Sequence, residues 1–234
     1  MKYQGIFFDL DGTLLPMDND TFIKGYLGLL SREVAPLGYT AETMIPTMWR
    51  GVAAMVKNDG SRTNFDIFWE YFAGAFGKQV YDHISRFDAF YRDGFHKAAA
   101  FTAPTPLAKQ AVTLARQKAE RVVLATNPFF PRVAVDSRLS WAGLSPADFD
   151  LITSYENSHS CKPNPAYYRE ICQRLDLEPA KCLMIGNNAD EDAGAAQAAG
   201  LSAYLLTDCL ISEGTLPDCP KGSFAELIAF LDAL

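Results

Sequence analysis

Cysteine is scarce in this sequence, and no two cysteines form a CxxC pair, because the five lie at positions 161, 172, 182, 209 and 219. An odd number at these spacings argues against both a disulfide framework and a tetrahedral zinc site. Free thiols in a reducing compartment are the simpler interpretation, so we expect a cytoplasmic protein.

Long apolar runs are also missing, since no stretch approaches the roughly 20 residues that a transmembrane helix needs. The apolar start at residues 6–8 is interrupted at once by acidic residues and is too short for a signal peptide. We therefore expect no membrane partner.

Positive charge is in deficit, with 21 Lys and Arg against 28 Asp and Glu and a net charge of -7. This balance argues against a nucleic-acid polymer as partner, because its phosphate backbone requires clustered basic side chains. A small anion remains compatible, because a local positive group or a bound divalent cation can hold it within an acidic protein.

Short apolar runs alternate with helical patterns along most of the chain. The runs at residues 6–8, 122–124, 183–185 and 203–206, with 150–153 as a fifth candidate, are typical of buried parallel strands. Helical patterns cover residues 106–120, 131–141, 165–175, 192–199 and 224–234. This order predicts an α/β fold with a doubly wound, Rossmann-like parallel sheet.

The alternation stops between residues 16 and 100, where only helical patterns occur, at 20–35, 41–57, 64–76 and 79–96. Aromatic residues recur there at helical spacing, which is more typical of a packed core than of a ligand site. We therefore predict an all-helical domain at residues 16–100, inserted into an α/β core formed by residues 1–15 and 101–234.

The segment Asp9-Leu10-Asp11-Gly12-Thr13 places two carboxylates one residue apart at the end of the first predicted strand. In a parallel sheet, the carboxyl ends of the strands form the ligand crevice. Such a pair can provide a nucleophile, a metal ligand or an acid and base. The alternative is a solvated Asp-Gly turn, because short motifs often match by chance.

Three further polar segments follow predicted strands. Thr126-Asn127 offers a hydroxyl and a backbone amide for a phosphoryl oxygen, although such pairs often simply form turns. Lys162 can offset negative charge, although a loop lysine is usually solvated. The acidic loop at residues 186–192 suits Mg²⁺, although acidic residues also favour a helix start. The four segments are expected to meet at one edge of the sheet.

In this arrangement the sequence resembles the haloacid dehalogenase superfamily of phosphohydrolases. Residues 9–13 resemble its first motif, Asp-x-Asp-x-Thr, and Thr126 and Lys162 resemble its second and third. Residues 186–192 resemble the fourth motif, and the insert at residues 16–100 resembles the helical cap domain of that superfamily. The resemblance covers the whole predicted core.

The resemblance implies a catalytic role for four residues. Asp9 is expected to attack phosphorus and form an aspartyl-phosphate, and Asp11 to serve as the general acid and then the general base. Thr126 and the Asn127 amide are expected to bind the phosphoryl oxygens. Lys162 is expected to steady Asp9 and the charge in transfer.

The resemblance also implies a Mg²⁺ cofactor, held by Asp9, the backbone carbonyl of Asp11 and the fourth motif. That motif usually begins Gly-Asp, whereas Asn187 stands at the second position here. Asn187, Asp190 and Asp192 are all candidate ligands, and the sequence leaves open which of them contact the metal.

The implied activity is hydrolysis of a phosphate monoester on a small phosphorylated metabolite, by a monomer or homodimer. Substrate choice is expected to lie in the cap, where Arg50 and Arg62 are candidate contacts for a second anionic group. Taken singly, each of these arginines is more typical of an ordinary surface position.

Several alternatives remain open from the sequence. A phosphomutase would keep the same core residues, and a phosphonate hydrolase would use a cap lysine such as Lys24 or Lys57. Haloacid hydrolysis is disfavoured, because the dehalogenases that this core resembles lack the carboxylate found here at Asp11. A catalytically silent binding protein is favoured only by Asn187.

Overall fold

The computed structural model describes residues 3–234, and within them the strands form one parallel sheet with the order β3-β2-β1-β4-β5-β6. The strands are β1 (Tyr3–Phe8), β2 (Ala119–Leu124), β3 (Leu151–Ile152), β4 (Cys182–Gly186), β5 (Ser202–Leu206) and β6 (Lys221–Gly222). The five predicted strands are present. The sixth, β6, was not predicted, because two residues carry no apolar run.

Strand β1 lies in the middle of the sheet, where the direction of winding reverses. The chain goes from β1 outward to β2 and β3, then returns across to β4 on the other side of β1. Phe8, the last residue of β1, pairs with Leu124 on one side and Ile185 on the other. In open α/β sheets the ligand crevice lies at this reversal, outside the carboxyl ends of the strands.

Helices cover both faces of the sheet, as the predicted doubly wound fold requires. Ile6 and Phe8 belong to one apolar cluster, whereas Phe7 points to the opposite face and belongs to another. The first cluster includes residues of α5 (Leu107–Lys118), α6 (Arg132–Trp141) and α9 (Phe224–Asp232), and the second includes residues of α7 (Pro165–Leu175) and α8 (Ala195–Ala198). The predicted α/β fold class is confirmed.

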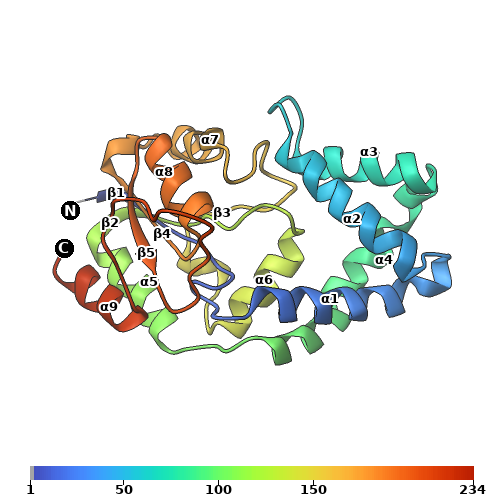
Figure 1. The fold of residues 1–234 in the computed structure, drawn as a ribbon, viewed down its shortest axis with the longest axis horizontal. Helices are drawn as coiled ribbons and strands as arrows, with labels where there is room; N and C mark the ends of the chain where they lie inside the picture. Colours follow the sequence, from blue (N-terminus) through green and yellow to red (C-terminus); the bar gives the residue numbers. More distant parts are fainter. Residues whose placement is uncertain (1–2) are drawn as a thin grey trace.

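The helical half of the molecule extends away from the sheet, to the right in Figure 1. It contains α1 (Asn19–Val34), α2 (Ala41–Val56), α3 (Asn64–Phe76), α4 (Val80–Arg92) and the 3₁₀ segments η1 (Ala35–Leu37) and η2 (Gly94–Phe101). The sequence predicted one helix over 79–96, but α4 ends at Arg92 and a 3₁₀ segment begins at Gly94. Glycine is a poor continuation for a helix interior.

Side-chain caps explain where two of these helices begin. The Asp18 carboxylate accepts a hydrogen bond from the Thr21 amide at 2.8 Å, and the Thr63 hydroxyl accepts one from the Asp66 amide at 3.2 Å. The aromatic residues form a shared interior, in which the Phe72 ring lies 5.7 Å from that of Phe68 and 5.9 Å from that of Phe87. The predicted use of these aromatics as core is therefore confirmed.

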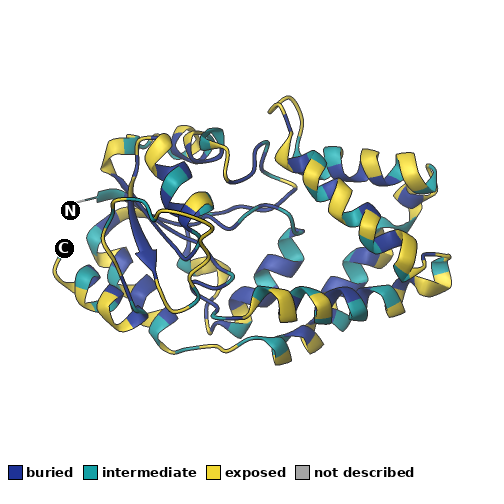
Figure 2. Ribbon diagram, viewed as in Figure 1, coloured by how far each residue is buried: buried dark blue, intermediate teal, exposed yellow. Residues whose placement is uncertain are grey.

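One apolar cluster runs without a break from the sheet into the helical half. It contains Ile6 and Phe8 of β1 together with Phe22, Phe72 and Phe95. Figure 2 shows the outcome, with dark blue inner faces and yellow outer faces on the helices. The two halves are thus joined by packed side chains as well as by the chain itself, while the boundaries at residues 15/16 and 100/101 stay a prediction.

Short helical segments complete the fold. They are the 3₁₀ segments η3 (Pro146–Asp148) and η4 (Pro179–Lys181) and the π-helical segment η5 (Ala189–Gly194). The sequence predicted a helix over 192–199, whereas the structure starts this helical region at Ala189 with η5 and continues into α8. No helix within residues 3–234 has the length and apolar character that crossing a membrane requires. All five cysteines are free thiols.

Candidate active site

Asp9 follows β1 directly and is held at the reversal point by backbone pairing on both sides. Its amide donates to the Ile185 carbonyl at 2.9 Å, and the Ala125 amide donates to the Phe8 carbonyl at 2.7 Å. The chain then turns at Gly12, whose φ of 81° is readily adopted only by glycine. A Cβ at this position would overlap the Asn187 side chain. The turn therefore requires glycine both for its conformation and for space.

Lys162 connects two of the predicted site carboxylates. Its side chain is only 1% exposed, and Nζ donates to Asp9 Oδ1 at 2.9 Å and to Asp192 Oδ1 at 2.6 Å. Burial alone would lower the pKa of Lys162, but the two carboxylates outweigh it and hold the pKa well above its ordinary value. Lys162 is therefore a fixed buried cation, which a solvated loop lysine would not be.

The same environment changes the titration of Asp9. Burial raises the pKa of this carboxyl to about 7; Lys162 opposes the rise, and Asp192 and Asp11 add to it. A carboxylate in this position carries less negative charge than one in water. Any further positive charge brought next to Asp9 would favour its ionised, nucleophilic form.

Asp11 pairs with a residue that sequence reasoning missed. Arg138 of α6 has no exposed surface, donates from Nη1 to Asp11 Oδ2, and lies with its guanidinium carbon 4.2 Å from the centre of the Phe130 ring. Burial raises the pKa of Asp11, while Arg138 and Lys162 oppose that rise. The second oxygen of Asp11, Oδ1, is buried without a hydrogen-bond partner.

Thr126 and Asn127 extend from β2 beside Asp9. The Thr126 carbonyl accepts hydrogen bonds from the hydroxyls of Thr153 and Tyr167, both at 2.8 Å, which fixes the backbone at this position. Asn127 Nδ2 donates to Glu191 Oε2 at 3.0 Å, and Asn127 Oδ1 is buried without a partner. This segment therefore presents an unsatisfied amide oxygen beside the predicted nucleophile.

The acidic loop after β4 brings two of its three candidate ligands to the site. Asn187 Oδ1 accepts from the Thr13 hydroxyl at 2.9 Å, and Asn187 Nδ2 donates to the Cys209 carbonyl at 2.7 Å. Asp192 is 2% exposed, and its Oδ2 accepts from the Asn188 amide at 2.9 Å.

Asp190, by contrast, is exposed, and its hydrogen bonds come from its backbone: its amide donates to Asn188 Oδ1 at 3.1 Å, and its carbonyl accepts from the Ala195 amide. The Asn188 side chain caps η5 by accepting from the Asp190 amide and from the amide of Glu191. The loop thus serves both of the purposes that the sequence left open, because it caps a helical segment and also presents side chains to the site.

These residues line one cavity of about 260 Å³, which we call the catalytic pocket. Its wall includes the predicted site residues Asp9, Asp11, Thr126, Asn127, Asn187 and Asp192, together with Glu191, which belongs to the acidic loop but was not among the predicted site residues. Asp190, Arg50 and Arg62 do not line it. Lys162 lies behind the wall and acts on the pocket through Asp9 and Asp192.

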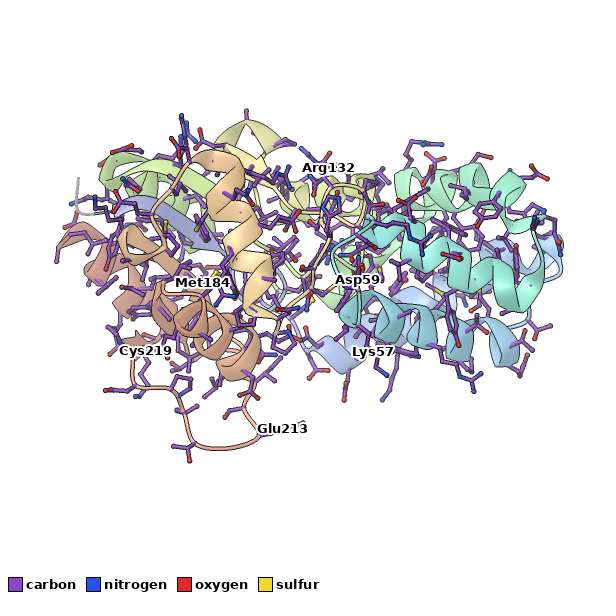
Figure 3. The ribbon with its side chains drawn as sticks, turned by 90° about the horizontal axis from the view of Figure 1, so that it is seen from above. Lys57, Asp59, Arg132, Met184, Glu213 and Cys219 are labelled. Carbon is purple, nitrogen blue, oxygen red and sulfur yellow. The ribbon has the colours of Figure 1, made fainter. Side chains whose placement is uncertain are left out.

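The structure does not bring Arg62 to the catalytic pocket. Arg62 lies on the segment between α2 and α3 and pairs with Glu70 at 2.5 Å, with both side chains about half exposed. Lys57 and Asp59 mark the same segment in Figure 3, with Met184 marking the sheet. This pairing is typical of a surface arginine, so the structure gives no support to a substrate contact from Arg62, nor from Arg50.

The donor atoms of the catalytic pocket fit a hard divalent cation, although the set is weakly charged. Within residues 3–234, no three His, Cys, Asp or Glu side chains group as a metal site. Asp9 and Asp192 supply carboxylates, and Asn187 supplies an amide oxygen where a third carboxylate would complete such a group. All are oxygen ligands, which Mg²⁺ prefers.

A second cavity, which we call the aromatic pocket, lies between the helical half and the loop after β2. It has a volume of about 110 Å³ and is lined by aliphatic and aromatic side chains and a proline, including Leu27, Trp69, Phe87 and Pro131. Ile23, Trp49, Phe129 and Phe130 line both this cavity and the catalytic pocket. The two cavities are therefore neighbours that share part of their wall.

Comparison with known proteins decides the family. A family model described as haloacid dehalogenase-like hydrolase matches residues 3–200, which include all four predicted motifs. The chain belongs to this family of hydrolases. The resemblance inferred from the motifs and the prediction of a hydrolase are both confirmed.

Individual relatives are more distant. Phosphoglycolate phosphatase of Neisseria gonorrhoeae (strain ATCC 700825 / FA 1090) is 26% identical over 208 residues, which cover 87% of this chain and 80% of the relative. This haloacid dehalogenase-like chain also resembles solved structures of the family. A 2-haloacid dehalogenase from Pseudomonas syringae pv. tomato DC3000 has a TM-score of 0.62 at 19% identity, covering 97% of this chain and 99% of the other.

The HAD-hydrolase YfnB of Bacillus subtilis, whose structure is bound to magnesium, has a TM-score of 0.59 at 19% identity and covers 99% of this chain and 100% of its own. At these identities the likeness establishes the shared fold of this haloacid dehalogenase-like hydrolase. Its chemistry has to be argued from the side chains of its own pocket.

Proposed function

We propose that this hydrolase cleaves phosphate monoesters of small metabolites, with Mg²⁺ as cofactor and Asp9 as a covalent nucleophile. The observation that carries the proposal is the buried Lys162, which bridges Asp9 and Asp192. A pure binding site for a phosphate gains nothing from a carboxylate beside it, because two anions repel. A nucleophile next to a cation is the arrangement that phosphoryl transfer requires.

Asp9 attacks phosphorus, and the bond from phosphorus to the leaving oxygen breaks. Asp11 gives its proton to that oxygen, so that an alcohol departs, and then takes a proton from the water that hydrolyses the aspartyl-phosphate. Burial raises the pKa of Asp11, which favours the protonated form needed first. Arg138 opposes this effect and so keeps the carboxyl able to act as a base in the second step.

Thr126, Asn127 and Lys162 position the transferred group and offset its charge. Mg²⁺ would be held by Asp9, Asn187 and Asp192 with the Asp11 carbonyl, and would supply positive charge between an anionic nucleophile and an anionic phosphate. The magnesium-bound YfnB relative supports this choice of cofactor for the same fold. The phosphatase name of the Neisseria relative supports the choice of a phosphate ester.

The helical half, at residues 16–100, is proposed as a cap over this chemistry. Its residues Asn19, Phe22, Ile23 and Trp49 line the catalytic pocket together with the carboxylates of the core. A cap of this kind excludes water and contacts the leaving group. A cytoplasmic location and a monomeric or homodimeric state stay predictions.

Haloacid hydrolysis, phosphonate hydrolysis and phosphomutase activity are the remaining candidates of the same family. Neither Lys24 nor Lys57, the candidate amines for phosphonate cleavage, lines the catalytic pocket. The buried Asp11–Arg138 pair argues against haloacid hydrolysis, because displacement of a halide requires no proton for its leaving group. A phosphomutase would return the phosphate to a second hydroxyl rather than release it. Measuring free phosphate therefore separates a phosphatase from a phosphomutase.

The experiment is hydrolysis of p-nitrophenyl phosphate with Mg²⁺ and with EDTA, for the natural chain and for Asp9→Asn. We expect release of phosphate only by the natural chain with Mg²⁺, and a loss of at least about 10³-fold in kcat for the variant. The exposed Asp93→Asn is the matched control and should keep full activity. Equal activity of Asp9→Asn and the natural chain would exclude Asp9 as the nucleophile.

A second readout tests the metal without turnover. If Mg²⁺ binds the folded state but not the unfolded state, it should raise the melting temperature of the protein. Asp9→Asn should reduce that increase. An identical increase in both proteins would place the metal elsewhere.

A further inference from the structure

The aromatic pocket lies where the leaving group of a bound phosphate ester would extend. It shares Ile23, Trp49, Phe129 and Phe130 with the catalytic pocket, so the two cavities lie side by side and these four side chains belong to the wall between them. A phosphoryl group beside Asp9 has its ester oxygen directed away from the nucleophile in an in-line displacement. Whatever is attached to that oxygen next meets the shared wall.

Neither pocket offers a positive charge to the leaving group. Among the described residues that line the two cavities, none is Lys, Arg or His. The catalytic pocket instead contains the carboxylates of Asp9, Asp11, Glu191 and Asp192. A second anion on the substrate would lose its hydration without gaining a partner, which is costly in an apolar cavity.

Arg138 does not change this balance, although its Nη2 is buried without a partner. Its side chain has no exposed surface and lines neither cavity, because it is covered by Phe130 and committed to Asp11 through Nη1. A ligand would have to displace Phe130 to reach it.

The three tyrosines and Trp69 of the aromatic pocket bind one another in pairs. The hydroxyls of Tyr26 and Tyr91 lie 3.2 Å apart, and Trp69 Nε1 donates to the Tyr155 hydroxyl at 3.4 Å. Burial also raises the pKa of Tyr26 to about 12, so this phenol stays neutral. The surface left for a ligand is therefore mainly apolar ring and aliphatic carbon.

The size of the aromatic pocket limits its occupant. Its volume of about 110 Å³ is somewhat smaller than the roughly 150 Å³ of an engineered apolar cavity that accepts benzene. One ring, or an aliphatic group of similar size, is the largest group that fits without movement of the walls.

We propose that the natural substrate is a phosphate monoester whose leaving group carries one uncharged apolar group of about the size of a single ring. This proposal rests on the proposed phosphatase function and specifies its substrate class. It also separates this chain from its phosphoglycolate phosphatase relative, because the name of that relative implies a substrate with a carboxylate on the leaving group.

Three esters test the proposal with the same connection to phosphorus. Benzyl phosphate, ethyl phosphate and 2-phosphoglycolate all carry a CH₂ group on the ester oxygen, and they differ in having a ring, a methyl group or a carboxylate beyond it. We expect kcat/KM for benzyl phosphate to exceed that for ethyl phosphate by at least about 10-fold, and 2-phosphoglycolate to be the poorest. Equal values, or a preference for 2-phosphoglycolate, would overturn the proposal.

Variants at Trp49 locate the preference. This residue is 48% exposed and lines both cavities, so its replacement is compatible with folding. Trp49→Ala should lower the benzyl-to-ethyl ratio of kcat/KM by about 10-fold, and Trp49→Arg should raise the relative kcat/KM for 2-phosphoglycolate. The matched control Tyr71→Ala, an exposed aromatic that lines neither cavity, should leave both ratios unchanged. Unchanged ratios in the Trp49 variants would exclude the aromatic pocket as the leaving-group site.

A binding experiment keeps this proposal separate from the proposed reaction. Benzylphosphonate and phosphonoacetate carry the same two groups on a carbon–phosphorus bond, which a phosphate-ester hydrolase does not cleave, and calorimetry with Mg²⁺ present measures their affinities. Tighter binding of benzylphosphonate without hydrolysis of any ester would refute the phosphatase and keep the pocket. Hydrolysis of all three esters, with phosphonoacetate binding as tightly as benzylphosphonate, would keep the phosphatase and refute the pocket.

Discussion

The two neighbouring pockets of this protein differ in almost every physical property. The catalytic pocket is built on strand ends, carries four carboxylates and is backed by the buried cations Lys162 and Arg138. The aromatic pocket is built largely on helices and has no charged residue in its wall.

From this contrast we infer that the two halves of the molecule have different roles, one in the reaction and the other in the choice of substrate. In the proposed function, charges at the end of a rigid parallel sheet define the reaction, because they must be held in fixed positions. In the proposed substrate class, the helical half defines which leaving group is accepted, because its side chains only have to match size and polarity. The chemistry and the specificity can therefore be changed separately, which the following predictions use.

Among changes that affect both stability and chemistry, the largest expected effect comes from breaking the ion pair between Arg138 and Asp11. Arg138→Gln leaves Asp11, whose side chain is 23% exposed, without its cation, so we expect a loss of about 2–3 kcal/mol in the free energy of unfolding and about 10²-fold in kcat. Urea unfolding and steady-state kinetics measure the two effects.

The same helix provides a matched control for that change. Arg132 pairs with Asp136 at the surface, where both side chains are about 40% exposed, so Arg132→Gln should cost less than about 1 kcal/mol. If Arg132→Gln and Arg138→Gln had equal effects, burial would not be what distinguishes the charges of the catalytic pocket.

An effect of similar size on stability, without one on chemistry, is expected in the helical half. Phe72 is 1% exposed and lines neither pocket, so Phe72→Ala should lower the free energy of unfolding by about 3–5 kcal/mol. Below the melting temperature, kcat/KM should stay within about threefold. A selective loss of kcat would show that the reaction depends on the helical interior after all.

A smaller effect is expected from adding a charge to the catalytic pocket. Asn187→Asp should lower the Mg²⁺ concentration needed for half-maximal activity, because a carboxylate replaces a neutral ligand. The variant should also lose about 1–2 kcal/mol of stability without Mg²⁺, because Asn187 Nδ2 no longer donates to the Cys209 carbonyl. An unchanged Mg²⁺ requirement, with the stability loss present, would mean that residue 187 supports the loop without contacting the metal.

The smallest effect concerns a charge far from both pockets. Burial would raise the pKa of Asp148, but the Lys109 ammonium, 2.7 Å away, and the Ser145 amide hold it below its ordinary value. The ionised form thus stabilises the fold above the unfolded pKa, and this contribution is lost as the pH falls through the lower folded pKa.

Asp148→Asn should accordingly cost roughly 0.5–1 kcal/mol at pH 7 and progressively less below about pH 4, with kcat unchanged. Urea unfolding of both proteins across this pH range measures the difference. A cost that stays constant with pH would assign it to packing rather than charge.

The sequence predicted the fold and the site where a local residue pattern and a chemical motif fall on the same segment. The alternation of apolar runs and helical patterns predicted the parallel sheet, and the polar segments after its strands predicted six of the residues that line the catalytic pocket. Helix limits were predicted to within a residue or two for α1, α2 and α3. The pattern failed over residues 79–96, where one continuous apolar periodicity concealed the change to a 3₁₀ segment at Gly94.

Two features of the site could not be predicted because they depend on distant contacts. Arg138 stands in an ordinary helical pattern, and only the packing of α6 against the turn after β1 makes it a buried partner of Asp11. Arg50 and Arg62, by contrast, were selected as candidate contacts but do not line the catalytic pocket, because local sequence does not show whether a basic side chain faces a pocket or the solvent. The aromatic pocket could not be predicted for the same reason, since the residues of its wall come from separate helices and loops.

The central position of β1 also has a consequence for how the protein forms during synthesis. This apolar strand is made before the other strands of its sheet, and its two partner strands begin only at residues 119 and 182. Until the ribosome has produced both, β1 has no neighbours and its nonpolar surface is open to unwanted association. Assembly must therefore be slow compared with that of a locally connected bundle, and Asp9 reaches its place only after most of the chain has emerged.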